Sequence, residues 1–218
     1  MNFIKKSCAL VLFASLAACI EGTDQIDTVS IEELAALQSR AKSVQNKLPE
    51  DLVGTATMSG GMYLGEWGEE QENEIFVTVG NMNMVADFTN SEISGAATEL
   101  KNYNISGECS EIQDCDIELL VSLDGELVLD GVINGPNFTG TLNGELTASE
   151  EVTNGEETFT ATSVADIEMD VAGSFLIDDA GLMAGADLLG DASVDYSVDG
   201  EIIDTNVLTF EGLFIVAE

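Results

Sequence analysis

Cysteine is the residue type in this sequence whose chemistry and spacing define candidate sites. The 218-residue chain contains four cysteines and no histidine. Without histidine, Ser-His-Asp and Cys-His catalytic arrangements are excluded. Paired carboxylates carry no information about catalysis here, because a chain with 41 acidic residues contains many close pairs by chance. The chemistry that remains is that of the thiol, either as a covalent attachment point or as half of a disulfide.

The segment before Cys19 has the organisation of a cleaved export signal. Lys5 and Lys6 precede a mostly apolar, uncharged run over 8–16, and the tetrapeptide L-A-A-C follows at 16–19. A membrane-spanning helix needs about 20 apolar residues, and this run is well short of that length. The pattern therefore predicts a signal peptide over residues 1–18.

The tetrapeptide at 16–19 resembles the lipobox of bacterial lipoproteins. In that family the cysteine thiol receives a diacylglyceryl group, and cleavage leaves this cysteine as the first residue. The resemblance implies that Cys19 is the lipidation site and the point of membrane attachment, which several acyl chains make stable. The alternative is a coincidental cysteine beside an ordinary cleavage site. In that family, an aspartate directly after the cysteine tends to retain the lipoprotein in the inner membrane. Ile20 stands at this position, so an outer-membrane location is expected.

Two further cysteines lie in an acidic segment, C-S-E-I-Q-D-C, at Cys109 and Cys115. Cys8 leaves with the signal peptide and Cys19 is the expected lipid site. In an exported protein the remaining pair predicts a disulfide that closes a short loop. A zinc site is the alternative, but zinc would need four ligands, and the chain has no histidine and no other free cysteine.

The predicted mature chain is strongly acidic. Removal of residues 1–18 leaves 41 acidic and 4 basic residues, a net charge of −37. Such a chain repels phosphate, so no nucleic acid is expected as a partner. The charge indicates solubility in a saline setting, with a basic protein partner or loose cation binding as alternatives. Hydrophobic residues make up 45% of the sequence, which favours a packed core over disorder.

The segments that follow Cys19 are expected to be a tether over 19–29 and a helix over 30–48. Ser30 and Glu33 form a capping box at the helix start. Apolar residues then recur at three- and four-residue steps up to Leu48, and Pro49 ends the helix. We expect this amphipathic helix to pack against the following domain, with a spacer role as the alternative.

Beyond Pro49 the apolar period changes to two. Apolar residues alternate with polar ones over 117–123, 138–146, 167–177 and 208–216. Turn pairs such as Asp124-Gly125, Asn154-Gly155 and Asp199-Gly200, and the turn at 134–137, separate such runs. Eight or nine strands with no helical segment between them predict an all-β fold. Its expected form is an antiparallel up-and-down barrel of about eight strands, which removes open sheet edges.

The expected barrel is soluble rather than transmembrane. A transmembrane barrel needs a continuous outward apolar band with aromatic girdles. In this sequence the face opposite the expected core carries acidic residues, and only 6% of residues are aromatic. These acidic residues are Glu118, Glu145, Asp166, Glu168 and Asp170.

Short glycine motifs within 53–218 resemble the barrel domain of the transferrin-binding protein B family. The run GVINGPNFTGTLNG at 131–144 carries the family's turn and F-x-G step, and an earlier D-F-x…I-x-G step is matched by Phe88 and 93–95. Two G-x-F motifs at 173–175 and 212–214 and a glycine-rich strand at 181–190 complete the pattern. The resemblance implies a surface or periplasmic lipoprotein whose barrel spans 49–218.

The sequence also departs from that family. Residues 177–179 (I-D-D) stand where the family has a glycine, and the chain has room for one barrel where the transferrin receptor has two lobes. The resemblance therefore does not carry transferrin binding to this chain.

The function expected from the sequence is non-catalytic. No phosphate-binding or dinucleotide-binding loop occurs in the right context, and 187–199 lacks the spacing of a calcium loop. We expect no cofactor, no metal site and a monomer.

The expected function is an outer-membrane-anchored lipoprotein that binds a host or environmental protein or a small solute through barrel loops. The alternative is a structural or envelope-maintenance lipoprotein with no soluble ligand. No ligand-binding residue is identified. The methionines and aromatic residues around 58–84 are assigned to the barrel core and one loop, with an adaptable binding surface as the alternative.

Overall fold

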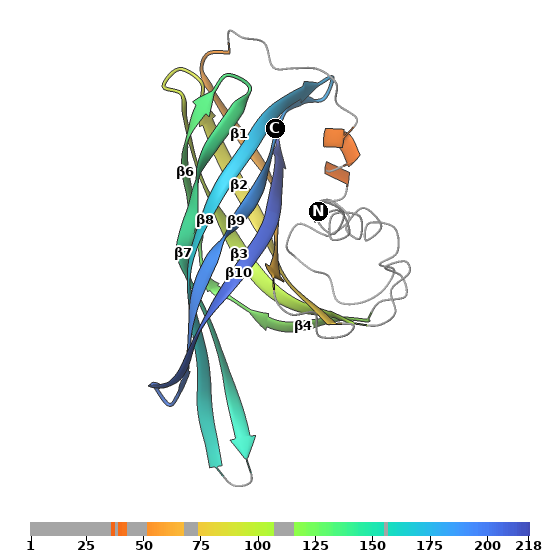
Figure 1. Cartoon of the computed structure of the whole chain (residues 1–218). Helices are drawn as coiled ribbons and strands as arrows, with labels where there is room; N and C mark the ends of the chain where they lie inside the picture. Colours follow the sequence, from red (N-terminus) through yellow and green to blue (C-terminus); the bar gives the residue numbers. More distant parts are fainter. Residues whose placement is uncertain (1–35, 38, 43–51, 68–73, 107–115, 155–156) are drawn as a thin grey trace, which may run out of the picture.

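The structure is a computed structural model that describes residues 36, 37, 39–42, 52–67, 74–106, 116–154 and 157–218. Ten β-strands account for most of these residues (Figure 1). They are β1 (Thr55–Trp67), β2 (Glu74–Asp87), β3 (Glu92–Ser106), β4 (Asp116–Ser122), β5 (Asp124–Gly125), β6 (Leu127–Asn134), β7 (Asn137–Asn154), β8 (Glu157–Asp178), β9 (Gly181–Val198) and β10 (Glu201–Ala217).

Eight of the strands form a closed ring in which every pairing is antiparallel. The order around the ring is β1, β2, β3, β6, β7, β8, β9 and β10, and β10 pairs back onto β1. The outer edge of β3 is shared, because its first half pairs with β6 and its second half with β4. The prediction of an all-β antiparallel meander is confirmed, and the ring order follows the chain order.

The inward-facing side chains form one buried hydrophobic cluster. In β8, Ile167, Met169 and Val171 are buried, whereas the alternate residues Asp166 and Glu168 are exposed. The period of two in the sequence therefore does separate an inner from an outer face. Three buried phenylalanines of this cluster lie close together, with Phe175 5.0 Å from Phe138 and Phe138 6.2 Å from Phe214 between ring centroids.

Two of the predicted turns join ring strands in the structure, and Gly155 of the predicted Asn154-Gly155 turn lies outside the described residues. Asp199 and Gly200, between β9 and β10, both have positive φ (49° and 82°), as a two-residue type I′ hairpin turn requires. Gly135, in the turn between β6 and β7, also has positive φ (60°). The interpretation of Asp124-Gly125 as a turn is wrong: these residues form β5, which pairs with Leu146 and Thr147 of β7.

The orientation expected for 117–123 is also wrong in part. Leu119 is 51% exposed and pairs with Tyr103, on the outer face of β3, rather than facing the core. Glu118 pairs with Asn104, which lies on the same face as the core residue Leu100. The register between β3 and β4 shifts at Asn102/Tyr103, and such irregularities change which residues face the core.

The part of the predicted N-terminal helix that the structure describes is helical at 36, 37 and 39–42. The rest of the predicted helix over 30–48 lies outside the described residues, as do the predicted signal peptide over 1–18 and the tether over 19–29. Within the described part of the chain, no helix has the length and apolar character needed to cross a membrane.

Candidate functional site

A second hydrophobic cluster lies on the outside of the ring. It is formed by Tyr63, Val77, Val79, Tyr103, Ile105, Met183 and Ile215, all 9% exposed or less. We refer to these seven residues as the outer cluster. They alternate with inward residues of β1, β2, β3, β9 and β10, so these strands are buried on both faces over part of their length. Burial of the Tyr63 ring raises the pKa of its hydroxyl to about 12.

The sequence contains a pattern that indicates the outer cluster, and a search for alternating apolar residues does not detect it. Residues 213–217 (L-F-I-V-A) and 182–184 (L-M-A) are continuous apolar runs. A strand that is buried on both faces has such a run, whereas a strand with one wet face alternates. These runs therefore marked the covered side of the ring.

Helical residues 36, 37 and 39–42 contribute to this covered side. Leu37 and Ala41 pack against the outer cluster, together with Leu213 and Leu176 of the strands. The two helical positions are four residues apart, so they share one helix face. These two described residues therefore pack against the outside of the ring.

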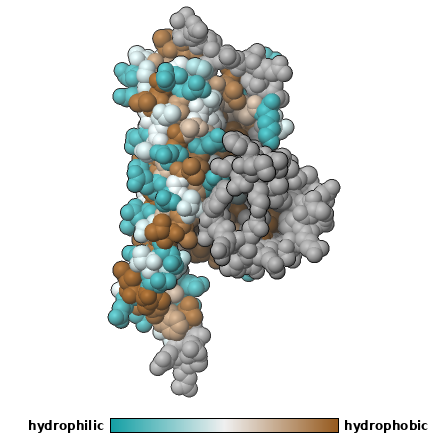
Figure 2. Space-filling view, viewed as in Figure 1, coloured by the Kyte–Doolittle hydropathy of each residue, from teal (hydrophilic) through white to brown (hydrophobic). Residues whose placement is uncertain are grey.

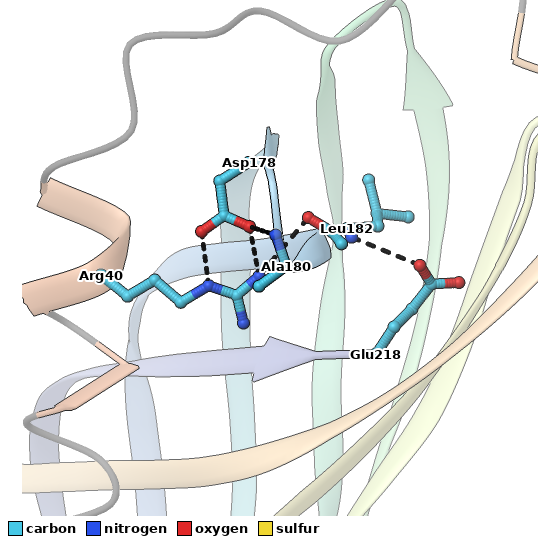
Figure 3. Close-up of polar contacts among 6 residues, drawn as sticks. Arg40, Asp178, Ala180, Leu182 and Glu218 are labelled. Carbon is cyan, nitrogen blue, oxygen red and sulfur yellow. Dashed lines mark hydrogen bonds and ion pairs between the residues drawn. The ribbon is translucent and has the colours of Figure 1, made fainter.

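Arg40 joins the same helical segment to the turn between β8 and β9. Its Nε donates to Asp178 Oδ2 at 2.6 Å and its Nη2 donates to Asp178 Oδ1 at 2.6 Å (Figure 3). Nη2 also lies 3.5 Å from the carbonyl oxygen of Gly181. The planar guanidinium matches the carboxylate in this two-point geometry, which fixes the direction of the contact as well as its charge.

The turn that carries Asp178 is held by its own hydrogen bonds. Asp178 Oδ1 accepts from the backbone N–H of Ala180 at 2.8 Å, and Glu218 Oε2 accepts from the N–H of Leu182 at 3.3 Å (Figure 3). The hydrogen bond from Arg40, together with the Ala180 bond, holds the pKa of the Asp178 carboxyl low, at about 2. Asp178 therefore remains charged across the ordinary pH range.

A groove of about 240 Å³ lies between the helical segment and the outer face of β8, β9 and β10. Lys42 and Asp187 supply its charged side chains, and Ser174 supplies a hydroxyl. Its remaining lining is apolar or glycine: Ala41, Ala172, Gly173, Gly185, Ala186, Leu213 and Ile215. Drug-sized ligands occupy pockets of about 300–1,000 Å³, so this groove suits at most a small solute.

The polar residues on the inner face gather on β2 and β3. Asn102 Nδ2 lies 3.3 Å from Thr78 Oγ1, to which it donates. The Oδ1 atoms of Asn102 and Asn104 are buried and accept no hydrogen bond within the described part of the chain. Buried carbonyl oxygens without a donor destabilise the folded state, so this corner of the ring interior is polar but incompletely paired.

The site residues predicted from the sequence are not brought together by the described structure. Cys19, Cys109 and Cys115 lie outside the described residues, so lipidation and the disulfide stay predictions. Met58, Met62, Met82 and Met84 are at most 1% exposed in the ring interior, which confirms their assignment to the core. Across the described ranges, no three Cys, Asp or Glu side chains are grouped closely enough to hold a metal ion.

No protein-family model, curated protein or solved structure matched the chain. The class of protein that the described residues define is an all-β protein built on a closed antiparallel ring, with an apolar interior and a helical segment on one outer side.

Proposed function

We propose that this protein is a lipid-anchored, non-catalytic binding module of the outer membrane, which captures a protein or a small solute on the outside of a soluble β-barrel. The observation that carries the proposal is the division between the two faces of the ring. Phe138, Phe175 and Phe214 are at most 1% exposed and belong to a buried hydrophobic cluster to which all eight ring strands contribute. A ligand inside the ring would have to displace this core, so binding is expected at the loops, hairpin ends and outer surface.

The outer face of β8 supports a barrel that stands in water. Asp166, Glu168 and Asp170 are exposed on consecutive outward positions. A lipid-facing band would be apolar, because charged side chains on the lipid face of a transmembrane barrel are destabilising. Membrane attachment is assigned instead to acyl chains on Cys19, and the loop between Cys109 and Cys115 is assigned a disulfide. The barrel motifs that resemble the transferrin-binding protein B family support a placement at the cell surface or in the periplasm.

The lipid anchor is tested by metabolic labelling of cells with a radioactive or clickable palmitate analogue. The full chain should be labelled and should fractionate with the outer membrane. A Cys19→Ser variant should lose the label, whereas a Cys8→Ser variant should keep it, because Cys8 lies in the predicted signal peptide. Labelling that survives Cys19→Ser would contradict the assignment.

The binding role is tested by affinity capture with the full chain in mild detergent, at low salt and at seawater salt. A specific partner recovered in both conditions supports the proposal, and its absence in both contradicts it. Protease treatment of intact cells distinguishes the two possible settings. Cleavage indicates surface display, whereas protection together with failed capture favours the structural, envelope-maintenance alternative.

A further inference from the structure

In the described part of the chain, the first half of β10 pairs with one strand, β9. Pairing between β1 and β10 ends at Trp67↔Thr209, whereas β9 pairs with β10 as far as Glu201. Within the described ranges, no residue pairs with the other edge of β10 between Glu201 and Leu208. The β9–β10 hairpin accordingly extends past the end of β1 (Figure 1). The backbone N–H and C=O groups on this edge form a template on which another strand can add.

The side chains of this edge are exposed on both faces. All seven residues from 201 to 207 are exposed. Ile202, Ile203 and Val207 are 60%, 66% and 71% exposed, and apolar side chains gather over this end of the hairpin in Figure 2. β-Branched residues favour extended strands and gain most from a packed neighbour. The edge thus presents both unpaired backbone and apolar side chains that burial would stabilise.

Carboxylates surround the same edge. Glu201 and Asp204 belong to it, and on the adjacent strand β9 Asp195 Oδ1 accepts from Thr205 Oγ1 at 2.6 Å. Asp191 Oδ1 accepts from Thr209 Oγ1 at 2.7 Å, and Asp191 also lies directly opposite Glu168 of β8. Like charges in opposite positions of a sheet destabilise it, so a cationic side chain laid along this surface would be stabilising.

A second copy of the chain is a poor occupant of this edge. It would place its own Glu201 and Asp204 near the same residues, and the described bases, Arg40, Lys42 and Lys101, lie on the helical segment and β3. The bulge at Ile202/Asp204 also disfavours pairing of this edge with the same edge of a second copy. An acidic partner would be repelled by the carboxylates at this edge. A basic partner would be attracted by them.

We propose that the edge of β10 over Glu201–Leu208 binds an extended segment of a basic partner polypeptide as an added β-strand. Main-chain hydrogen bonds supply the affinity in this mode, and alternate side chains supply the specificity. Basic side chains of the added strand face the carboxylates of Glu201 and Asp204 on one face of β10, and its apolar side chains cover Ile202 and Val207 on the other face. The inference rests on the proposed binding function and gives it a surface and a class of partner.

The probe for the test is a fluorescein-labelled octapeptide of alternating lysine and valine, measured by anisotropy against the full chain in mild detergent. A second peptide has the same sequence with alternate backbone nitrogens methylated, which blocks strand pairing without changing charge. The protein variants are Glu201→Lys/Asp204→Lys at the edge and Glu150→Lys/Glu151→Lys on β7. The two variants carry the same change in net charge, and all four residues are exposed.

The edge variant is expected to bind the lysine–valine peptide about tenfold more weakly than wild type, because charges of the contact surface are reversed. The β7 variant should differ from wild type by about twofold, since distant charges are screened by salt. The methylated peptide should bind weakly to all three proteins. Hydrogen exchange should slow at the amides of 201–208 when the unmethylated peptide is added.

The outcomes separate this inference from the proposed function. Equal weakening in the two variants, unchanged binding of the methylated peptide, no binding by wild type, or protection away from β10 would each overturn the edge assignment. If affinity capture still recovers a partner in those cases, the binding function stands and only its surface is wrong. Slowed exchange at 201–208 with no partner captured from cells would support the edge and contradict the cellular role.

Discussion

Arg40 donates two hydrogen bonds of 2.6 Å to the carboxylate of Asp178, a residue 138 positions farther along the chain. This contact connects the helical residues 36, 37 and 39–42 to the turn between β8 and β9. It lies at the margin of the outer cluster, where Leu37 and Ala41 pack. The pair therefore orients the helix on the ring, while the apolar contacts beneath it hold the two together.

The substitution Asp178→Asn tests that orientation. The amide oxygen of the new side chain can still accept from Ala180 N–H, so the turn is preserved while the charge that attracts Arg40 is lost. Amides at 36–42 should exchange faster with solvent, whereas amides of β8 and β9 should not change. Asp179→Asn is the matched control, because Asp179 is exposed and adjacent. Equal exchange in the two variants would contradict the assigned role of the pair.

The same contact should respond to acid. The pKa of Asp178 is about 2, below the usual value of about 3.9 for an aspartate, because Arg40 and backbone N–H groups stabilise the charged form. A depressed pKa contributes stability that is present above pH 4 or so and is lost as the pH falls through about 2. Carboxyl NMR titration should give this low value in wild type and a higher one in Arg40→Gln. Asp87, whose pKa is lowered by Asn90, should be unaffected by Arg40→Gln.

The ring interior should be sensitive to loss of one of its buried phenylalanines. Phe175 is 1% exposed and its ring lies 5.0 Å from Phe138 and 5.1 Å from Phe88. Phe175→Ala should lower the free energy of unfolding by about 3–5 kcal/mol, because it leaves a cavity in a packed core. Val207→Ala, at a 71% exposed position, should change it by less than about 0.5 kcal/mol. Urea titration followed by tryptophan fluorescence or circular dichroism measures both, and similar losses would argue against a filled interior.

Two glycines of β9 should differ sharply in their tolerance of alanine. A Cβ at Gly190 would collide with the carbonyl oxygen of Glu168 and approach Met169 Cα to 2.5 Å, and both atoms belong to the backbone of β8. At Gly185 the nearest atoms would be 3.8 Å away, which is ordinary contact. Gly190→Ala should destabilise by about 1–3 kcal/mol, as overpacking does. Gly185→Ala should be near neutral, and a reversed order of the two midpoints in urea would contradict the packing described for β9.

The disulfide between Cys109 and Cys115 stays a prediction with a direct test. Mass spectrometry of the exported protein, alkylated without prior reduction, should show neither cysteine modified. After reduction both should be alkylated. A Cys109→Ser variant should expose a single reactive thiol at Cys115, and alkylation of the unreduced wild-type chain would refute the pairing.

The ring could be predicted from the sequence because the patterns that indicate its strands and turns each lie within a short segment of the chain. The alternation in β7, β8 and β10 and turn residues such as Asp199-Gly200 act over short distances, and the structure confirms the antiparallel meander that they indicate. The same reasoning failed at β4, where Leu119 is exposed and pairs with an outer residue of β3 next to a register shift at Asn102/Tyr103. A bulge depends on the neighbouring strand, so the residues at 117–123 alone could not have predicted it.

The outer side of the ring could not be predicted because it depends on contacts between distant segments. Arg40 is close to Asp178 only after the intervening strands are in place, and the sequence contains many aspartates that could serve equally well. The runs at 182–184 and 213–217 indicated a strand covered on both faces, but not what covers it. Among the described residues, the pairing of β1 with β10 stops at Trp67↔Thr209, and only this register shows that Glu201–Leu208 has no described partner on that edge.

The pairing of β1 with β10 has a consequence for how the protein folds. Neighbouring hairpins such as β7–β8 and β8–β9 need only short loops to close, so they can form in any order as the chain becomes available. Ser59 and Ala217 pair across almost the whole length of the ring-forming sequence, and this contact must wait until the strands between them are in place. Ring closure is therefore the step with the largest entropic barrier, and we expect it to limit the folding rate. Until it occurs, the outer edges of both β1 and β10 remain open along their full length, and this is the interval in which the chain is most prone to aggregation.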